Sequence, residues 1–464
     1  MQFTQLPVAN EILQAISTLG FEETTKTQAL ALPDVLSGKD VAVEAKTGSG
    51  KTLAFALGIL QKRITQPVDA NPSALVLCPT RELAEQVAEQ IRLLAKQIPN
   101  YKVLTLFGGV AMGPQLASLK HAPDLVVGTP GRIIDIMGKK ALSLAGVNTL
   151  VLDEADRMLD MGFAEQMDWL LRQISQNSNK PQTLLFSATF GGKIQTLSKQ
   201  FQHNASVIKI EEAKTPSKIE QQAWQLLPDK KDYAVAALLT EHQPKSAMVF
   251  CNTKVDVKQL ADSLREMSFD VVELHGDLEQ ESRNNAIRMF SSDCANVLIA
   301  SDVAARGLDI PSVDLVINAD VSPDVDTHIH RIGRTGRAGA SGLALTLIEA
   351  HQIPHLEKIG AFLEQKIPVK QMQALRFHAN RIVEAKFNGI EINAGKKAKI
   401  NKGDILGALT KQADIDGDDI GKIQVAAQRS FIAIKSRSVK RALNLFREQK
   451  VKGKRVKARK VQTI

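Results

Sequence analysis

A glycine-rich stretch that ends in a lysine and a hydroxyl residue is the part of this sequence best suited to chemistry. It runs from Ala45 to Thr52 and reads Ala-Lys-Thr-Gly-Ser-Gly-Lys-Thr. Such a loop turns its backbone N–H groups toward phosphate oxygens, with Gly48 and Gly50 supplying the turn and Lys51 reaching the outer phosphates. Thr52 would then hold Mg²⁺. Because Ala45 stands where the strict pattern has glycine, a turn that only caps a helix stays open as the alternative.

Two carboxylates that follow a later strand could complete such a site. The apolar run Thr149–Leu152 is followed at once by Asp153-Glu154-Ala155-Asp156. Asp153 can orient Mg²⁺, usually through water, and Glu154 can polarise the attacking water. Acidic residues after strands also occur as plain helix N-caps. The phosphate loop upstream favours metal chemistry.

The elements around these residues predict how they are positioned. The phosphate loop lies between a short strand at Asp40–Glu44 and a helix at Leu53–Lys62, which is the context that the motif requires. Strands alternating with helices predict a parallel sheet whose functional residues follow the carboxyl ends of the strands. The remaining strands of this half are expected at Ala74–Cys78, Tyr101–Phe107, Asp124–Val127 and Thr183–Phe186.

The alternation restarts in the second half of the chain. The polar stretch Lys193–Ser217 is interpreted as a hinge, and further strands are expected at Ala247–Phe250, Val271–Leu274, Val297–Ala300, Val313–Ile317 and Leu343–Leu347. This half has no phosphate loop of its own, but it has two arginine–glycine segments, Ala305–Asp309 and His330–Arg337. They could contact a γ-phosphate across a cleft. A solvated basic loop is the alternative.

Composition limits the class of protein. A length of 464 residues suggests two to four domains, and 44% hydrophobic with 23% charged residues is ordinary for a globular protein. There is no basic start followed by an apolar segment and no run of about 18 apolar residues, so we expect no signal peptide, no membrane contact and a cytoplasmic location. Three scattered cysteines predict neither a disulfide framework nor a zinc site.

Positive charge is concentrated at the end of the chain. Residues 394–464 contain 19 Lys and Arg against 6 Asp and Glu, whereas the remainder contains 40 against 44. The overall net charge of +9 therefore belongs to the tail, which is where a polyanion is expected to bind.

The motifs together resemble a known family. From Phe3 to about Ile367 the chain is similar to the DEAD-box ATP-dependent RNA helicases, whose name tetrad stands at Asp153–Asp156. The resemblance implies two RecA-like parallel-sheet domains in tandem, with ATP and Mg²⁺ as cofactors and RNA as partner. It departs from the family pattern at Thr24 and Lys26, where prolines are usual, at Lys46, which replaces a glutamine, and at Ser301, which replaces a frequent threonine.

The resemblance also implies residue roles. Lys51, Asp153, Glu154, Arg334 and Arg337 are expected to be catalytic, the two arginines as arginine fingers, and Thr52 with Asp153 to hold the metal. Nucleotide binding is expected at Phe3, Gln28, Ala45, Lys46, Thr47, Gly48, Ser49, Gly50, Lys51, Thr52 and Asp309. RNA binding is expected at Pro79, Thr80, Arg81, Glu82, Gly108, Gly109, Thr129, Pro130, Gly131, Arg132, Gln280 and Arg283. Ser187 and Thr189 would link the ATP site to the RNA face.

The tail reads as a small RRM-like α+β domain. Helices are expected at Gly403–Gln412 and Ser438–Arg447, and strands at Ile390–Ile392, Ile420–Ala426, Ser430–Ile434 and Arg455–Val461. This segment resembles the C-terminal domain of bacterial DEAD-box helicases directed to 23S ribosomal RNA. Its third strand offers one aromatic residue, Phe431, so recognition should depend on charge and hydrogen bonds more than on base stacking.

The sequence thus predicts three domains, at residues 1–206, 216–370 and 388–464. We expect a monomeric RNA-dependent ATPase that unwinds RNA locally, with 23S rRNA in pre-50S ribosomal particles as its partner in assembly of the large subunit. Two rivals stay open: an RNA clamp or scaffold that uses ATP as a switch with little unwinding, and a DNA translocase built on the same core.

Overall fold

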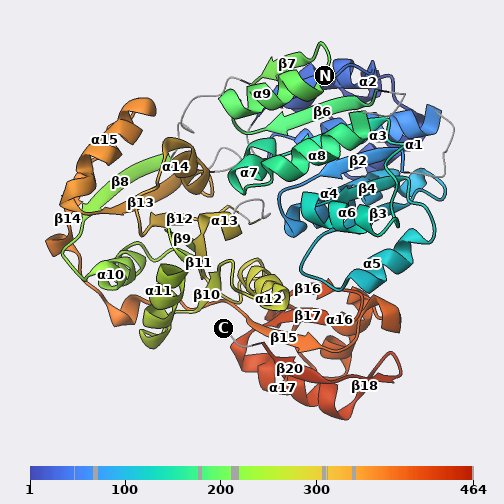
Figure 1. Ribbon diagram of the computed structural model, residues 1–464. Coiled ribbons are helices and arrows are strands. Elements are labelled where there is room, and N and C mark those ends of the chain that lie inside the picture. Colours follow the sequence, from blue (N-terminus) through green and yellow to red (C-terminus); the bar gives the residue numbers. More distant parts are fainter. Residues whose placement is uncertain are drawn as a thin grey trace. The chain divides into compact units, whose positions relative to one another are not determined.

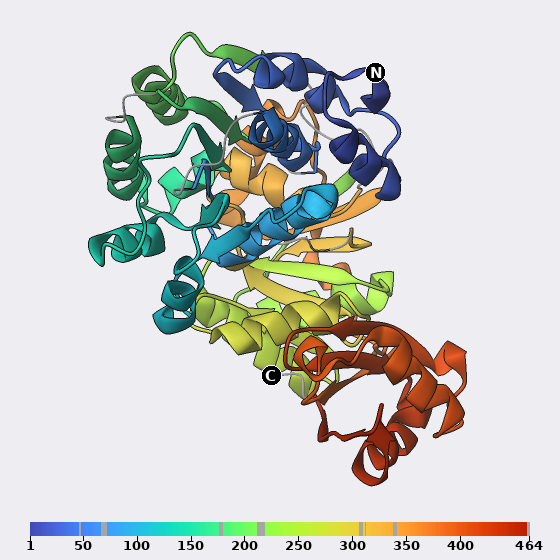
Figure 2. The same cartoon turned by 90° about the vertical axis from the view of Figure 1, so that its right-hand side faces the viewer.

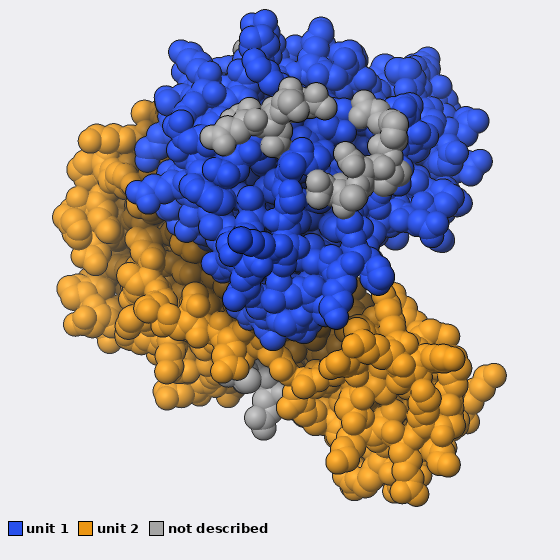
Figure 3. Space-filling view, turned by 45° about the vertical axis from the view of Figure 1, so that its right-hand side comes forward, with its two compact units in different colours: residues 1–212, 307–309 blue, residues 213–306, 310–464 orange. Residues whose placement is uncertain are grey.

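The computed structural model describes residues 1–45, 48–65, 72–175, 180–210, 219–305, 310, 312–336 and 341–461. The described residues as far as 210 form one compact unit, and those from 219 onward form a second (Figure 3). The two-sheet architecture with a small C-terminal domain agrees with the fold class predicted from the sequence (Figure 1).

The first unit is built on a parallel sheet with strand order β3-β4-β2-β5-β6-β1-β7. The strands are β1 (Val41–Glu44), β2 (Ala74–Leu77), β3 (Val103–Leu106), β4 (Leu125–Gly128), β5 (Thr149–Asp153), β6 (Gln182–Ser187) and β7 (Ser206–Lys209). The helices are η1 (Phe3–Gln5), α1 (Asn10–Thr18), α2 (Lys26–Leu36), α3 (Lys51–Thr65), α4 (Arg81–Leu94), η2 (Ala95–Gln97), α5 (Met112–Leu119), α6 (Pro130–Gly138), α7 (Ala155–Asp160), α8 (Ala164–Ser175) and α9 (Gly192–Phe201).

Helices cover both faces of this sheet, which explains why its strands are apolar at nearly every position. Alternate residues of a strand belong to two separate cores: Val76 packs with α1 to α4, whereas Leu75 and Leu77 pack with α6 to α9. Phe55 of α3 meets Phe186 of β6 in the first core, with their ring centroids 5.3 Å apart. The carboxyl edge of the sheet is therefore held from both sides.

The second unit contains a parallel sheet with strand order β10-β11-β9-β12-β13-β8-β14. Its strands are β8 (Ile219–Gln225), β9 (Ala247–Cys251), β10 (Val271–Leu274), β11 (Val297–Ser301), β12 (Leu315–Asn318), β13 (Gly342–Ile348) and β14 (Val369–Gln371). Its helices are α10 (Lys231–His242), α11 (Lys254–Glu266), α12 (Gln280–Phe290), α13 (Asp302–Ala305), α14 (Val325–Ile332), η4 (Ala350–Gln352), α15 (Ile353–Phe362), η5 (Met372–Ala374) and η6 (Ala379–Arg381).

The same unit ends in an antiparallel sheet with strand order β16-β17-β15-β20, packed against two helices and drawn in red in Figures 1 and 2. Its elements are β15 (Asn388–Ile392), η7 (Lys396–Ala398), α16 (Lys402–Lys411), η8 (Gly417–Asp419), β16 (Ile420–Val425), β17 (Ser430–Ile434), α17 (Ser436–Glu448), the hairpin β18 (Lys450–Val451) with β19 (Lys454–Arg455), and β20 (Ala458–Lys460). The predicted last strand, Arg455–Val461, is shorter than expected because the hairpin takes its first residue.

Two local predictions need correction. The polar stretch Lys193–Ser217 was interpreted as a hinge, but α9 and β7 lie inside it and β7 pairs with β1; residues 211–218 lie outside the described part of the chain. Strand β8 was not predicted because it is polar. The side chain of its buried Gln221 is hydrogen-bonded by Gln365 and His328.

Across the described ranges, none of the helices has the length and apolar character that crossing a membrane requires.

Candidate nucleotide and RNA sites

Two glycines of the phosphate loop have the backbone conformation that a phosphate cradle needs. Gly48 and Gly50 have φ of +84° and +89°, in the left-handed region that side chains disfavour. Lys51 begins α3 and is buried, and its Nζ donates to the Ala45 carbonyl at 2.7 Å. The Ser49 hydroxyl is buried and finds no hydrogen-bond partner within the described residues. Lys46 and Thr47 lie outside those residues.

Helix α2 is fixed to this loop by its first turn. Thr25 and Gln28 form a reciprocal capping box, and the Gln28 amide also donates to the Gly50 carbonyl at 3.1 Å. The Thr25 hydroxyl donates to the Ser49 carbonyl at 2.8 Å. Gln28 is therefore positioned beside the loop, while its role in reading adenine stays a prediction. Phe3 is only 3% exposed and packs in the core, and its contact with the base likewise stays a prediction.

Asp153, the last residue of β5, and Glu154, which follows it, are both buried, and neither side chain caps a helix. Glu154 sits at the N-cap position of α7 in a left-handed conformation, φ 53° and ψ 53°, and its side chain makes no capping bond but forms an ion pair with the buried Arg157. A non-glycine residue there is strained, which is common where a side chain is aimed for function. The plain N-cap alternative is thus not supported for Glu154.

Asp153 has the environment expected of a metal-binding carboxylate. Burial, reinforced by the neighbouring charge of Glu154 and opposed by Lys51, raises the pKa of Asp153 to about 7. Its Oδ1 is buried with no hydrogen-bond partner in the described part of the chain. Buried carboxylate oxygens normally have a partner, and a bound divalent cation would provide one for this oxygen. The residues therefore fit Mg²⁺ held by Asp153 with Thr52, the second residue of α3.

Asp156, the last residue of the segment Asp153–Asp156, connects this segment to the loop after β6. Its Oδ2 accepts hydrogen bonds from the Ala188 and Thr189 amides at 3.1 and 2.9 Å and from the Thr189 hydroxyl at 3.2 Å. Sequence reasoning gave Asp156 no role of its own. The order of strands could have suggested one, because β5 and β6 are neighbours whose ends meet at one edge.

The predicted RNA-binding residues of the first unit follow three adjacent strands. Pro79–Glu82 follows β2 and begins α4, Gly108-Gly109 follows β3, and Thr129–Arg132 follows β4 and begins α6. They are tied together by arginines, since Arg81 donates to the Gly108 carbonyl and Arg132 to the Val110 carbonyl, each at 3.1 Å. Gly109 has φ +72°, in the left-handed region that favours glycine, and a Cβ there would lie 1.8 Å from the end of the Arg81 side chain, which would have to move.

The strand order separates two groups of residues along one edge. The RNA candidates follow β3, β4 and β2, whereas the catalytic carboxylates lie at the end of β5 and the phosphate loop follows β1. The loop after β6, which carries the linking residue Thr189, lies between these last two strands. Functional groups at the carboxyl edge of a parallel sheet share a surface. Asp156 and Thr189 lie at the β5–β6 junction between the loops of the other strands.

In the second unit, the arginine segment contains a residue that sequence reasoning did not separate from its neighbours. Arg331 is 1% exposed and donates to both carboxylate oxygens of Asp302, to the Asn252 side chain and to the Asp320 carbonyl, at 2.6 to 2.7 Å. Its guanidinium also lies 5.4 Å from the centre of the Phe250 ring. Arg331 therefore holds β9, β11 and β12 together. The sequence feature that could have suggested this role of Arg331 is its partner Asp302, a carboxylate that directly follows β11.

The other predicted residues of this unit are placed as follows. Arg334 is buried just beyond α14, and its carbonyl accepts from the Val313 amide at 3.0 Å. Gln280 and Arg283 lie in the first turn of α12, where the Gln280 amide donates to Asn284 at 2.9 Å. Asp309 and Arg337 lie outside the described residues, so their roles stay predictions.

Comparison with known proteins agrees with this arrangement. Residues 25–197 match the model of the DEAD/DEAH box helicases, residues 229–339 that of the helicase conserved C-terminal domain, and residues 390–460 that of the DbpA RNA binding domain. The chain is 44% identical to the ATP-dependent RNA helicase DbpA of Escherichia coli K12 over 96% of both chains. It is 34% identical to DbpA of Bacillus subtilis 168 over 99% of both.

A solved structure agrees as well. S. cerevisiae Dbp5 bound to RNA and ADP BeF3 is similar with a TM-score of 0.70 and 30% identity, over 80% of this chain and 96% of that one. The matches extend over both parallel sheets and the C-terminal domain. The family predicted from the motifs is therefore confirmed. The chain belongs to the DEAD-box ATP-dependent RNA helicases of the DbpA type, whose activity is an RNA-dependent hydrolysis of ATP.

Proposed function

We propose that this helicase is directed by its C-terminal domain to 23S rRNA and acts on pre-50S particles during assembly of the large ribosomal subunit. It would work as a cytoplasmic monomer, with domains at residues 1–206, 216–370 and 388–464. The support for the rRNA target is the match of residues 390–460 to the DbpA RNA binding domain, together with the excess of basic residues in the tail.

The single observation that carries the coupling of ATP to RNA is the bond between Asp156 and Thr189. It connects the segment that carries Asp153 and Glu154 with the loop after β6, whose Ser187 and Thr189 are expected to link the ATP site to the RNA face. A change in the position of either loop is transmitted to the other through a buried carboxylate. Lys51 would bind the outer phosphates, and Glu154 would accept a proton from the attacking water.

Mg²⁺ would be held by Thr52 and Asp153, where it supplies positive charge against the phosphate oxygens. Arg334 and Arg337 would act as arginine fingers on the γ-phosphate, and Asp309 would contact the ribose. Gln280 and Arg283, in the first turn of α12, would grip the RNA backbone together with the residues after β2, β3 and β4. A backbone grip that senses 2′-hydroxyls selects RNA over DNA.

Crosslinking tests the target. The full-length protein and a version that ends at Lys386, before β15, are crosslinked to total cellular RNA and the recovered RNA is sequenced. We expect 23S rRNA to be enriched by the full-length protein and not by the shorter one. Equal recovery of 16S and 23S rRNA by the full-length protein would remove the proposed target.

The rival in which ATP is only a switch predicts slow turnover that RNA does not accelerate, with little duplex separation. A DNA translocase predicts equal stimulation of the ATPase by single-stranded DNA. Steady-state hydrolysis with rRNA, with single-stranded DNA and without nucleic acid separates the three readings.

A further inference from the structure

The C-terminal sheet lacks the binding surface that an ordinary RRM uses. Such domains stack RNA bases on aromatic residues of the central strands. Here the candidate aromatic, Phe431 of β17, is only 2% exposed, and its ring covers Gly389 of the neighbouring strand β15. Phe387 lies against Gly421 of β16 in the same manner. The aromatic rings on this face are therefore already packed against the sheet.

Polar residues of the same face are engaged within the second unit. Glu391 is 6% exposed and forms ion pairs with Arg429 and Arg459, and Arg429 also pairs with Glu281 of α12. The Gln424 amide donates to the Ser292 hydroxyl at 3.3 Å. Figure 1 shows α12 beside β16 and β17, in agreement with these contacts. RNA that binds this domain must therefore use other surfaces as well.

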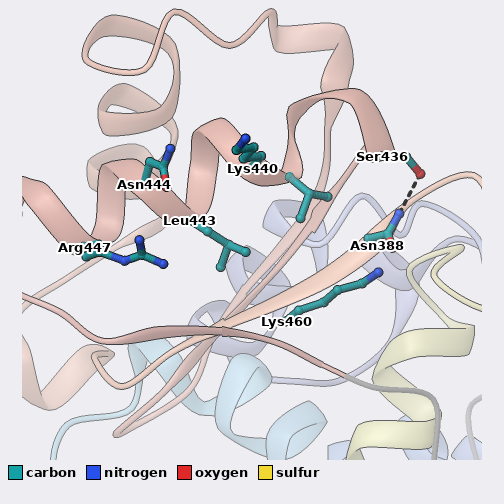
Figure 4. Close-up of a pocket in the computed structure, with 8 residues that line it drawn as sticks. Asn388, Ser436, Lys440, Leu443, Asn444, Arg447 and Lys460 are labelled. Atoms are coloured by element: carbon teal, nitrogen blue, oxygen red, sulfur yellow. Dashed lines mark hydrogen bonds between the residues drawn. The ribbon is translucent and has the colours of Figure 1, made fainter.

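The opposite side of the domain carries a groove of about 480 Å³ between α17 and the strands β15 and β20 (Figure 4). The helix residues that line it recur every three or four positions, so they form one face of α17. Lys460 belongs to this side because it pairs with Ile390, whose side chain is in the core beneath the helices. The lining is Asn388, Ser436, Val439, Lys440, Leu443, Asn444, Arg447 and Lys460.

Three cations of this groove are available for a ligand. Lys440, Arg447 and Lys460 are exposed, and within the residues that the structure describes none of their side chains forms a hydrogen bond or an ion pair. Some other basic residues of the domain are neutralised, as Arg437 is by Asp419 and Lys452 by Asp404. No acidic residue lines the groove.

The remaining lining suits a sugar–phosphate chain. The Asn388 amide donates to the Ser436 hydroxyl at 2.8 Å, which leaves the other atoms of this pair and the Asn444 amide to bond hydroxyl groups. Val439 and Leu443 are half-buried and offer an apolar floor. There is no aromatic residue on which a base could stack. The groove therefore combines positive charge, hydrogen-bonding groups and aliphatic contact without the means to read a base.

We propose that this groove, formed by α17, β15 and β20, binds the backbone of an RNA segment independently of its sequence. Lys440 and Arg447 lie seven residues apart, about 10 Å along the helix, so they contact separate phosphates. Lys460 contacts the chain from the strand side, and the amides contact 2′-hydroxyls. The inference rests on the proposed binding of rRNA, and it adds a second, nonspecific contact to whatever surface selects the target.

The test compares two double variants of the full-length protein. Lys440→Ala/Arg447→Ala removes two groove cations, and Lys411→Ala/Lys422→Ala removes two cations that are equally exposed and equally unpaired among the described residues. The affinity of each protein for labelled 23S rRNA is measured between 50 and 200 mM salt. Each lost phosphate contact lowers the slope of log affinity against log salt by about 0.7 to 0.9.

We expect the groove variant to lose about 1.4 or more from that slope, so that wild type loses about sevenfold more affinity than the variant over this salt range. The matched control should keep the wild-type slope. Equal slopes for the groove variant and wild type would overturn the inference, provided that RNA stimulates the wild-type ATPase. A wild-type ATPase that rRNA does not stimulate would instead overturn the proposed function, and the inference with it.

An acidic protein segment is the other polyanion that this chemistry could attract. Poly-glutamate is therefore added as a competitor. If poly-glutamate binds wild type but not the groove variant, while the rRNA slope is unchanged in both, then the groove takes acidic protein and the RNA assignment is wrong.

Discussion

The Asp156 carboxylate accepts two hydrogen bonds from Thr189, one from its amide at 2.9 Å and one from its hydroxyl at 3.2 Å. Asp156 lies in the first turn of α7, the helix that follows β5, and Thr189 lies in the loop that follows β6. The residue that names the family's motif therefore serves as a link between two loops of the catalytic edge. Asp153 and Glu154, three and two residues earlier in the chain, are the residues proposed for the nucleotide chemistry.

Removing the Thr189 hydroxyl should weaken this link while leaving the ATP site intact. In Thr189→Val the amide bond to Asp156 stays and only the side-chain bond is lost. We expect ATP affinity within about threefold of wild type. The lost hydrogen bond is worth about 1.5 to 3 kcal/mol, but it is made to Asp156 and not to the nucleotide. Duplex unwinding per ATP hydrolysed should fall, as measured by paired ATPase and strand-displacement assays. A normal ratio with a tenfold weaker ATP affinity would place Thr189 in the nucleotide site instead.

Replacing Glu154 by glutamine should separate binding from hydrolysis. The side chain keeps its size and can still contact Arg157, but it can no longer accept a proton. We expect Glu154→Gln to bind ATP and RNA and to lose about 10² to 10⁴ in turnover, the usual contribution of a general base. Single-turnover hydrolysis of RNA-bound enzyme measures this directly. Turnover at the wild-type rate would remove Glu154 from its assigned role.

Asp153 should lower the stability of the nucleotide-free protein as pH rises. Its folded-state pKa, raised to about 7 by burial, exceeds the unfolded value of about 3.9, so the folded state keeps the proton to higher pH. The stability that this provides is fully present below the unfolded pKa and is lost as pH rises through the folded pKa. Asp153→Asn cannot ionise and escapes the loss.

Urea unfolding checks this between about pH 5 and 8. We expect the unfolding free energy of Asp153→Asn to rise relative to wild type by on the order of 2–3 kcal/mol over this range, then to level off. The same variant should bind Mg²⁺ and ATP poorly, so stability would increase where function decreases. A difference that does not change with pH would mean that the Asp153 carboxylate ionises normally.

Replacing Arg331 should lower the stability of the fold more than it changes the catalytic reaction. Its replacement by methionine removes the buried guanidinium and leaves the Asp302 carboxylate, which is 17% exposed, without its partner. Breaking a buried pair in this way costs about 3–5 kcal/mol. We expect Arg331→Met to lower the thermal midpoint strongly, as followed by circular dichroism. Wild-type stability with a specific loss of turnover would instead make Arg331 an arginine finger.

The sequence predicted most of the catalytic edge because its motifs fall where parallel strands end. The described residues of the phosphate loop, Asp153 and the residues after β2, β3 and β4 lie at strand ends as expected, while their roles stay predictions. The link through Asp156 and the buried network of Arg331 were not predicted, because both depend on which strands become neighbours. Strand β8 was missed for a related reason, since its polar Gln221 is buried only through bonds to Gln365 and His328.

The C-terminal domain shows the same limit. Its helices and strands follow from periodicity, and the strand Ser430–Ile434 offers Phe431 as its one aromatic residue. Burial of that ring depends on packing over Gly389, which a linear pattern does not reveal. The groove along α17 likewise appears only when β20 is paired with β15, because this pairing brings Lys460 opposite the helix.

One experiment tests the proposed function as a whole: the rate of steady-state ATP hydrolysis is measured with purified 23S rRNA, with 16S rRNA and with single-stranded DNA. The three nucleic acids are used at equal concentrations of nucleotide residues. An rRNA-directed helicase turns over fastest on 23S rRNA, markedly more slowly on 16S rRNA and near its basal rate on DNA. Rates that are the same on all three, or no faster than without nucleic acid, would contradict it.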